Sequence, residues 1–359
     1  MEKINSKEAT FLIISICINM SILIAGQTIV EQCGSSSLIN ACIISILAII
    51  IACIICLLYK KFIGLNILDI ANFLGGKVLK AIVGVIFLGY FIYTISVLLC
   101  RLADCLQIVY YPMTNIIYIV ILFVMATGIV CNIKNNAFSR VNLIIVPISL
   151  ITLILVFAGN AKNFDYQNIF PVLGNGINNT FIFGITNIFA FAGIAYLYFL
   201  PAKLKKPENF LKISLWGIGI SAIFLLIVVS IILFMFNSDK IGNQIFPLYL
   251  SVRYIEFGTF FQRMDSVYLL IRIISFLAFL GIMCNLCLNI FKSITKAKDE
   301  KPIIYPFMLT LLGVTMLIEK FGNVDFLQNT GFKILFISIV LGFGLLILIL
   351  ANIKKKIIK

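Results

Sequence analysis

The chain of 359 residues is 62% hydrophobic and only 12% charged, with a mean hydropathy of +1.13. Soluble domains are about half apolar and about a quarter charged, so the composition excludes an ordinary soluble protein and predicts an all-α polytopic membrane protein. The formal charge of +14 accompanies no nucleic-acid-binding motif, and the cations are spread among the connections, so no nucleic-acid partner is expected.

Apolar segments follow one another along the chain, each long enough to cross roughly 30 Å of hydrocarbon. We predict about ten transmembrane helices, near residues 9–30, 38–58, 81–109, 115–131, 141–158, 180–200, 213–236, 266–291, 303–318 and 333–351. The first is too long for the apolar region of a signal peptide and is interpreted as a mature span. Residues 1–359 are therefore expected to form one transmembrane permease-like domain embedded in a lipid bilayer.

The Lys and Arg residues of the connections are distributed unequally between the two sides. Twenty of them fall on the side that both termini share, and six fall on the opposite side. Positively charged connections stay in the cytoplasm, so both termini are predicted to be cytoplasmic.

Two connections, 59–80 and 237–265, are longer than the others and contain amphipathic pieces. They occupy equivalent places if the chain is divided into 9–158 and 180–351. Each half then holds five spans, so the second half is inverted relative to the first. This pattern predicts a 5+5 inverted repeat of the LeuT/APC type, which many secondary transporters share.

In such folds the first helix of each half is interrupted near mid-membrane. The span 9–30 contains "ILIAGQTIV", with Gly26 and Gln27 just past its centre. The span 180–200 contains "TNIFAFAGIAYLYFLP", with Gly193 in its middle. We therefore expect paired interruptions at these two places.

Several stretches resemble the endospore germination permease family, the B subunits of GerA-type germinant receptors within the amino acid–polyamine–organocation superfamily. They are "FDYQNIFPVLGNGI", "YFLPAKLKKPEN" and "FPLYLSVRYIEFGTFFQRMDSVYLL". "GYFIYTISVLLCRLADCLQIVYYPMTN" is similar to the family's arginine-then-acid pattern, although Asn115 stands where the family has proline. The resemblance covers essentially the whole chain, and the "PVLG-x-G" loop is among its most specific parts.

The resemblance implies a spore inner-membrane location and a partnership with an A-type membrane subunit and a C-type lipoprotein. The expected function is that of a receptor subunit that binds a small germinant, an amino acid, at mid-membrane. Binding would be signalled through a transporter-like conformational change that gates ions or water or acts on the partner subunits. The alternatives are a secondary amino acid transporter working by alternating access and, more remotely, a scaffold with a vestigial pocket.

Members of the superfamily bind substrate between the interruptions of the first and sixth spans, with the third and eighth spans as walls. Carried onto this chain, the resemblance predicts nine ligand-binding residues: Ala25, Gly26, Gln27, Tyr90, Thr94, Phe191, Ala192, Gly193 and Ala278. Ordinary core packing is the alternative interpretation for the aromatic members. The largely apolar set, without a central acid, favours small neutral amino acids over polyamines.

Three ionisable residues lie within the predicted spans. Arg101 and Asp104 share a helix face because of their i, i+3 spacing, and Arg272 is expected at a similar depth. A lone arginine in hydrocarbon costs about 2.5–3.5 kcal/mol on insertion scales, so we predict an intramembrane charge network of Arg101, Asp104 and Arg272. This network has two cations and one anion, so a ligand carboxylate or a lipid headgroup could supply the missing negative charge. The alternative is that the charges pair only to stabilise the fold.

The chain contains ten cysteines and no histidine. Cys53-x-x-Cys56 and Cys284-x-x-Cys287 lie inside apolar spans, where thiols behave as small hydrophobic groups. We therefore predict no metal site and no cofactor. The chain also lacks a phosphate-binding loop, a mid-membrane carboxylate pair and a nucleophile–base spacing, so an enzyme is not expected.

Overall fold

The computed structural model describes residues 3–132, 136–236, 246–255, 264–297, 301–321 and 331–357. These ranges are helices and their connections, apart from one isolated bridge between Ile4 and Leu204. Seven helical segments of the described chain are long and apolar enough to cross a membrane. The protein is therefore a multi-pass membrane protein, as the composition predicts.

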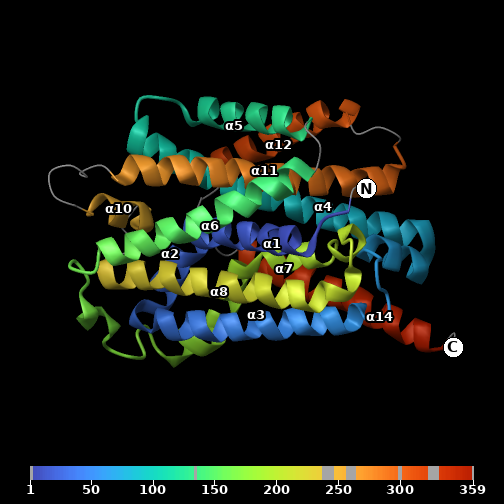
Figure 1. Ribbon diagram of the computed structural model, residues 1–359, viewed down its shortest axis with the longest axis horizontal. Coiled ribbons are helices and arrows are strands. Elements are labelled where there is room, and N and C mark those ends of the chain that lie inside the picture. Colours follow the sequence, from blue (N-terminus) through green and yellow to red (C-terminus); the bar gives the residue numbers. More distant parts are fainter. Residues whose placement is uncertain are drawn as a thin grey trace.

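The helices run side by side along the long axis of the molecule (Figure 1), and the start of α1 and the end of α14 lie at the same end of the bundle. The elements up to Gly159 are α1 (Ser6–Met20), η1 (Ser21–Ala25), α2 (Gly26–Cys33), η2 (Gly34–Ser36), α3 (Ser37–Tyr59), α4 (Ile67–Tyr110), α5 (Ile116–Cys131) and α6 (Asn136–Gly159).

The elements after α6 begin with short and irregular pieces and continue with long helices. They are η3 (Tyr166–Ile169), η4 (Asn178–Ile182), η5 (Phe183–Phe191), α7 (Gly193–Leu197), η6 (Pro201–Lys203), η7 (Pro207–Asn209), α8 (Phe210–Met235), α10 (Pro247–Arg253), α11 (Met264–Thr295), α12 (Lys301–Phe321), α13 (Phe332–Leu335), η9 (Phe336–Phe343) and α14 (Gly344–Ile357).

The seven apolar segments differ from the predicted spans in three places. The predicted spans 9–30 and 38–58 fall in one helical segment of 54 residues, Ser6–Tyr59, which turns at Gly34 with a φ of 63°. The span 115–131 is the 16-residue helix α5. The span 180–200 is irregular, because η5 and α7 replace a continuous α-helix there.

The two long connections contain helices at the places where the sequence is amphipathic. Helix α4 starts at Ile67, where the Asn66 side chain accepts a hydrogen bond from the Asp69 amide at 2.8 Å. Its first part ends at Gly75 and Gly76, which have non-helical dihedrals. In the second connection the structure describes the short helix α10, whereas residues 237–245 and 256–263 lie outside the described residues.

The first helix occupies the centre of the bundle. Helix α1 packs against α6, α8 and α11, and α3 packs along α8. Each of the α1 residues from Leu12 to Met20 is buried. This placement surrounds the junction between α1 and α2 with protein instead of lipid.

The "PVLGNG" loop is bonded to the end of the first span. Asn175 donates from its amide to the Cys33 carbonyl at 3.2 Å and from its side chain to the Gln32 carbonyl at 3.2 Å. Ser35 donates to the Pro171 carbonyl. Gly174, with a φ of 46°, lies so close that a Cβ atom would collide with the Cys33 carbonyl oxygen. The loop therefore fixes the end of α2 that lies away from the termini.

The Gly174→Ala variant is expected to lower the free energy of unfolding by on the order of 1–3 kcal/mol, because alanine is strained at this φ and meets the backbone of η2. Thermal unfolding of the purified protein measures the loss. Gly219→Ala is the matched control: its Cβ would meet no atom within 4 Å, and alanine favours a helix over glycine. Equal melting temperatures for the Gly174 variant and wild type would contradict the expectation.

Candidate functional site

The first span is widened, not broken, near its middle. Residues Ser21–Ala25 form a π-helix, and the flanking Met20 and Gly26 keep right-handed helical dihedrals. The interruption expected at Gly26 and Gln27 is thus replaced by a π-helix that ends just before them. Hydroxyl groups accompany it: Ser21 donates to the Cys17 carbonyl at 2.8 Å and Thr28 to the Ile24 carbonyl at 3.0 Å. π-Helices are rare and are frequent at functional sites.

Gly26 serves close helix packing in this conformation. A Cβ atom there would lie 2.5 Å from Val228 Cγ1 and 3.3 Å from Ile232 Cδ1, both on α8. Glycine is thus required by the neighbouring helix. The sequence pattern does not distinguish a glycine needed for close packing from one that exposes the backbone to a ligand.

The segment 178–200 is the second irregular helix. Its 3₁₀ part, η5, runs for nine residues, whereas 3₁₀ runs longer than about four residues are uncommon. At Gly193 a Cβ atom would lie 2.7 Å from Cys17 Sγ and 3.0 Å from the Ile13 carbonyl oxygen, so glycine lets α7 lie directly against α1. The segments η1 and η5 also contact each other.

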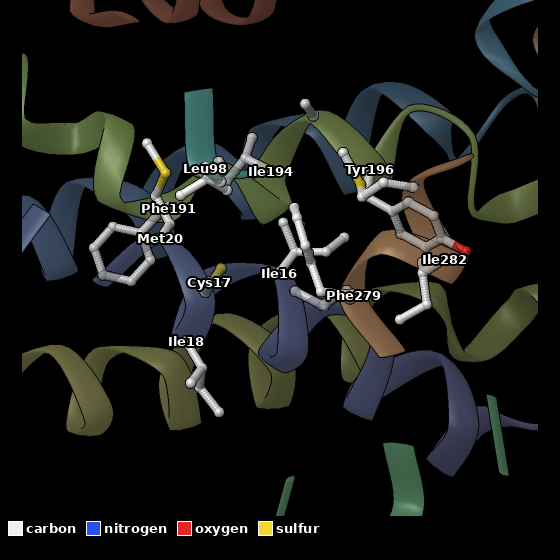
Figure 2. Close-up of a cluster of buried hydrophobic side chains, with 14 of the residues drawn as sticks. Ile16, Cys17, Ile18, Met20, Leu98, Phe191, Ile194, Tyr196, Phe279 and Ile282 are labelled. Carbon is white, nitrogen blue, oxygen red and sulfur yellow. The ribbon is translucent and has the colours of Figure 1, made fainter. Parts of the chain in front are cut away.

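Apolar side chains fill the space between α1 and the segment 178–200 (Figure 2). Ile16, Cys17 and Met20 of α1 lie among Phe191, Ile194, Leu98 of α4 and Phe279 of α11. All of these side chains are buried.

Most of the nine predicted ligand-binding residues are packed in this interior. Ala25, Phe191, Ala192 and Ala278 are buried. On α4, Thr94 donates to the Tyr90 carbonyl at 2.8 Å, and the Tyr90 ring contacts the Phe332 ring edge-on at 6.3 Å between centroids. Gln27, by contrast, lines a cavity.

The two intramembrane arginines are bound by neutral amides on either side of η1. Arg101 Nη2 donates to Gln27 Oε1 at 3.1 Å, and its guanidinium lies 4.7 Å from the centre of the Phe246 ring. Arg272 Nη2 donates to Asn19 Oδ1 at 3.1 Å. Asn19 precedes the π-helix and Gln27 follows it. Helix α11 is therefore hydrogen-bonded to the chain before η1, and α4 to the chain after it.

Arg101 and Asp104 interact electrostatically on α4, and the predicted charge network of Arg101, Asp104 and Arg272 stays a prediction. The structure records no ion pair between them, and the recorded hydrogen bond of Arg101 goes to Gln27. The i, i+3 spacing predicts the shared helix face but not the hydrogen bond of Arg101 to Gln27 on the first span.

A cavity lies beside Gln27 at the end of the bundle away from the termini. The centre of a water molecule can occupy about 40 Å³ of it. Residues of η1, α2, α4, α8, α10 and α11 line it together with Phe246: Ile22, Leu23, Gln27, Leu102, Cys105, Ile232, Phe246, Pro247, Leu248, Tyr249, Tyr268, Leu269 and Arg272. Two buried donor groups of this lining, Arg272 Nη1 and the Tyr268 hydroxyl, have no hydrogen-bond partner.

Sequence reasoning missed Asn19, Tyr268 and Tyr249. Asn19 is a polar residue within the apolar run "FLIISICINM", and Tyr268 lies one helical turn before Arg272; both signals were available. Tyr249 belongs to α10, where its hydroxyl donates to Asp265 Oδ2 at 3.2 Å and lies 2.8 Å from the Tyr110 hydroxyl. Only the fold reveals that α10 covers the cavity.

The cysteines gather into no recognisable metal centre in the part of the chain that the structure describes. No group of three or more cysteine, aspartate or glutamate side chains is placed there to hold a metal ion. All ten cysteines are free thiols, and Cys284 and Cys287 are buried within α11.

Comparison with known proteins relates the chain to one family. The sequence profile of the family described as "Spore germination protein" matches residues 3–322. The chain is 24% identical over 285 residues to "Spore germination protein YndE" of Bacillus subtilis (strain 168), which covers 77% of each chain. It is 26% identical over 207 residues to "Spore germination protein A2" of the same organism, covering 56% of this chain and 55% of that protein.

The Gln27→Leu variant is expected to destabilise the protein by about 1.5–3 kcal/mol, because it removes the amide that accepts from Arg101 and donates to Glu31 Oε1. Adding Arg101→Leu should recover much of the loss, since removing both partners is less costly than leaving one charge unpaired. Melting temperatures of the two single variants and the double variant form the test. Additive losses in the double variant would show that the two side chains act independently.

Proposed function

Because the chain belongs to the spore germination protein family, we propose that it is the membrane subunit of a germinant receptor, which binds a small amino acid germinant and responds by changing conformation. The family match over residues 3–322 is the observation that carries the proposal. Ligand binding would act by favouring one of two conformations of a transporter-like fold. No chemical step is assigned to the protein.

The proposed architecture is ten spans arranged as a 5+5 inverted repeat, with halves 9–158 and 180–351. Its support is that both irregular segments, η1 and η5, lie in the first span of a half and contact each other. The start of α1 and the end of α14 lie at one end (Figure 1), as an even number of spans requires. The cation distribution supports a cytoplasmic location for that end.

The proposed germinant site lies at the seam between η1 and η5, which contact each other; Ala25 belongs to η1 and Phe191 to η5. Next to this seam, apolar side chains fill the space between the end of α1 and Phe191 (Figure 2). Admission of a ligand therefore requires movement of side chains such as Phe191 or a change of helical hydrogen bonding. Irregular helices suit such a change, because their hydrogen bonds already deviate from the α-helical pattern.

The proposed location is the inner membrane of the spore, and the proposed partners are an A-type membrane subunit and a C-type lipoprotein. The similarity to "Spore germination protein A2" supports membership of such a receptor complex. A bundle of this kind also suits signalling through a path for ions or water.

A secondary amino acid transporter is the second candidate function. The same contact between η1 and η5 favours it, because alternating access moves one repeat against the other around a central site. The two candidates share a binding site and differ in whether the ligand crosses the membrane.

Deletion of the gene in the spore-forming host should abolish or strongly weaken germination in response to at least one amino acid. Release of dipicolinic acid from purified spores, recorded for each amino acid and for mixtures, measures the response. Reintroduction of the gene should restore it. Unchanged responses to every germinant in the deletion strain would refute the receptor role.

The purified protein in lipid vesicles is expected to show no saturable uptake of labelled amino acids, because the receptor proposal requires sensing and not turnover. Uptake is compared between vesicles with protein and protein-free vesicles, with and without an imposed ion gradient. Robust, saturable uptake in the absence of partner subunits would select the transporter.

A further inference from the structure

We propose that the cavity beneath α10 is a recognition site for the carboxylate of a small acid with an apolar side chain, with Arg272 and Tyr268 as the groups that bind it. The inference rests on the proposed function and deepens it, because it names the chemical feature by which a germinant is first recognised. Its support comes from the charge, the unpartnered donors, the apolar lining and the cover of this cavity.

The charge of Arg272 is uncompensated. The side chain is 4% exposed, and the acceptor recorded for it is the neutral amide oxygen of Asn19. Among the described residues no aspartate or glutamate forms an ion pair with it. A buried cation without a counterion is costly, so an anion that enters the cavity gains a strong partner.

Two unpartnered donors line the same cavity. Arg272 Nη1 and the Tyr268 hydroxyl are both buried without a hydrogen-bond partner, and the two residues lie one turn apart on α11. The Arg272 guanidinium can only donate hydrogen bonds, and the Tyr268 hydroxyl has one hydrogen to donate. A carboxylate has two acceptor oxygens and a negative charge, so it satisfies both hydrogen bonding and charge. Water satisfies the hydrogen bonds alone.

Apart from Gln27, Cys105 and Tyr249, the remaining lining is apolar and selects the rest of the ligand. Leu23, Leu102, Ile232, Leu248 and Leu269 supply hydrocarbon surface. A short aliphatic side chain is favoured against this wall, because its burial removes apolar area from water. The small volume of the cavity limits the ligand to a few carbon atoms.

Phe246, which covers the cavity, contacts a second cation, Arg101. Phe246 has a left-handed backbone with a φ of 57°, and it places the start of α10 over the cavity. Its ring lies against the Arg101 guanidinium. Arg101 has acidic groups nearby, because Asp104 interacts with it and Gln27 also donates to Glu31 Oε1 at 2.8 Å, so the uncompensated charge beside the cavity is that of Arg272.

The site is connected to the seam between η1 and η5 through Asn19. Arg272 shares its guanidinium between the cavity and Asn19, which lies two residues before the π-helix. A carboxylate that attracts the guanidinium therefore competes with Asn19 for it. Binding in the cavity thereby acts on the flank of η1.

The test compares three molecules that share one aliphatic branch: valine, 3-methylbutyrate, which lacks the amino group, and 2-methylpropylamine, which lacks the carboxylate. The full-length protein is held in nanodiscs of neutral phosphatidylcholine, and its melting temperature is recorded with each molecule and with sodium chloride at equal concentration. We expect valine and 3-methylbutyrate to raise the melting temperature and the amine and chloride to leave it unchanged.

The variants separate recognition from folding. Arg272→Leu should abolish the carboxylate-dependent shift, and it should fold, because it replaces a buried charge with an apolar group. Tyr268→Phe should weaken binding about tenfold through the loss of one hydrogen bond to a charged group. Arg140→Leu, which changes an exposed arginine of α6, is the matched control and should respond like wild type.

Several outcomes would overturn the proposal. They are an equal shift in wild type and Arg272→Leu, an equal shift with amine and acid, and no shift with any acid in wild type. A shift produced by adding anionic phosphatidylglycerol to the nanodiscs, present in wild type and absent in Arg272→Leu, would assign the cavity to a lipid headgroup and also overturn it.

Germination assays distinguish failure of this inference from failure of the proposed function. Spores carrying Arg272→Leu should need a higher concentration of an amino acid germinant than wild-type spores with equal amounts of the protein. If these spores respond normally while the deletion strain does not, the carboxylate site is wrong and the receptor role stands. If the deletion strain also responds normally, the receptor role itself is wrong.

Discussion

Hydrocarbon supplies no hydrogen-bond partner to a peptide group, and the arrangement of this protein depends on that constraint. Helices satisfy their own backbone, so irregular helical hydrogen bonding is tolerable only where protein surrounds it. The π-helix η1 meets this requirement at the centre of the bundle, between α4, α8 and η5. Polar side chains near it, such as Asn19 and Ser21, turn back to the carbonyls of Ser15 and Cys17. The glycines Gly26 and Gly193 then let neighbouring helices close around it.

The same constraint explains how two arginines are kept in the interior. Each guanidinium spans from one helix to an amide on the first span, Arg101 from α4 to Gln27 and Arg272 from α11 to Asn19. An amide oxygen satisfies one donor without adding a second ionised group to a medium that opposes charge. The cost is that the positive charge of Arg272 has no counterion among the described residues.

The sequence predicted the coarse architecture because its signal is simple. Apolar runs of membrane length, separated by polar connections, locate the long helices from Ser6 to Ile357, and the positions of Gly26 and Gly193 point to the unusual places in two of them. The kind of irregularity was not predictable, because π and 3₁₀ bonding arise from the neighbouring helices and not from a local pattern. Spacing also placed Arg101 and Asp104 on one face, but the hydrogen bond of Arg101 to Gln27 depends on the packing of the first span beside α4, which no local pattern predicts. The cavity under α10 brings together residues from Ile22 to Arg272, which no local pattern connects.

The position of the π-helix between Asn19 and Gln27 has a geometric consequence. Each residue of an α-helix turns the chain by about 100°, and a π-helical turn holds additional residues before it closes. If Ser21–Ala25 returned to α-helical bonding, everything beyond it would rotate about the helix axis relative to Asn19. Gln27 would then leave Arg101, provided that Asn19 stayed with Arg272. The rotation of the first span about its axis at η1 therefore determines whether Arg101 and Arg272 can keep Gln27 and Asn19 as partners at the same time.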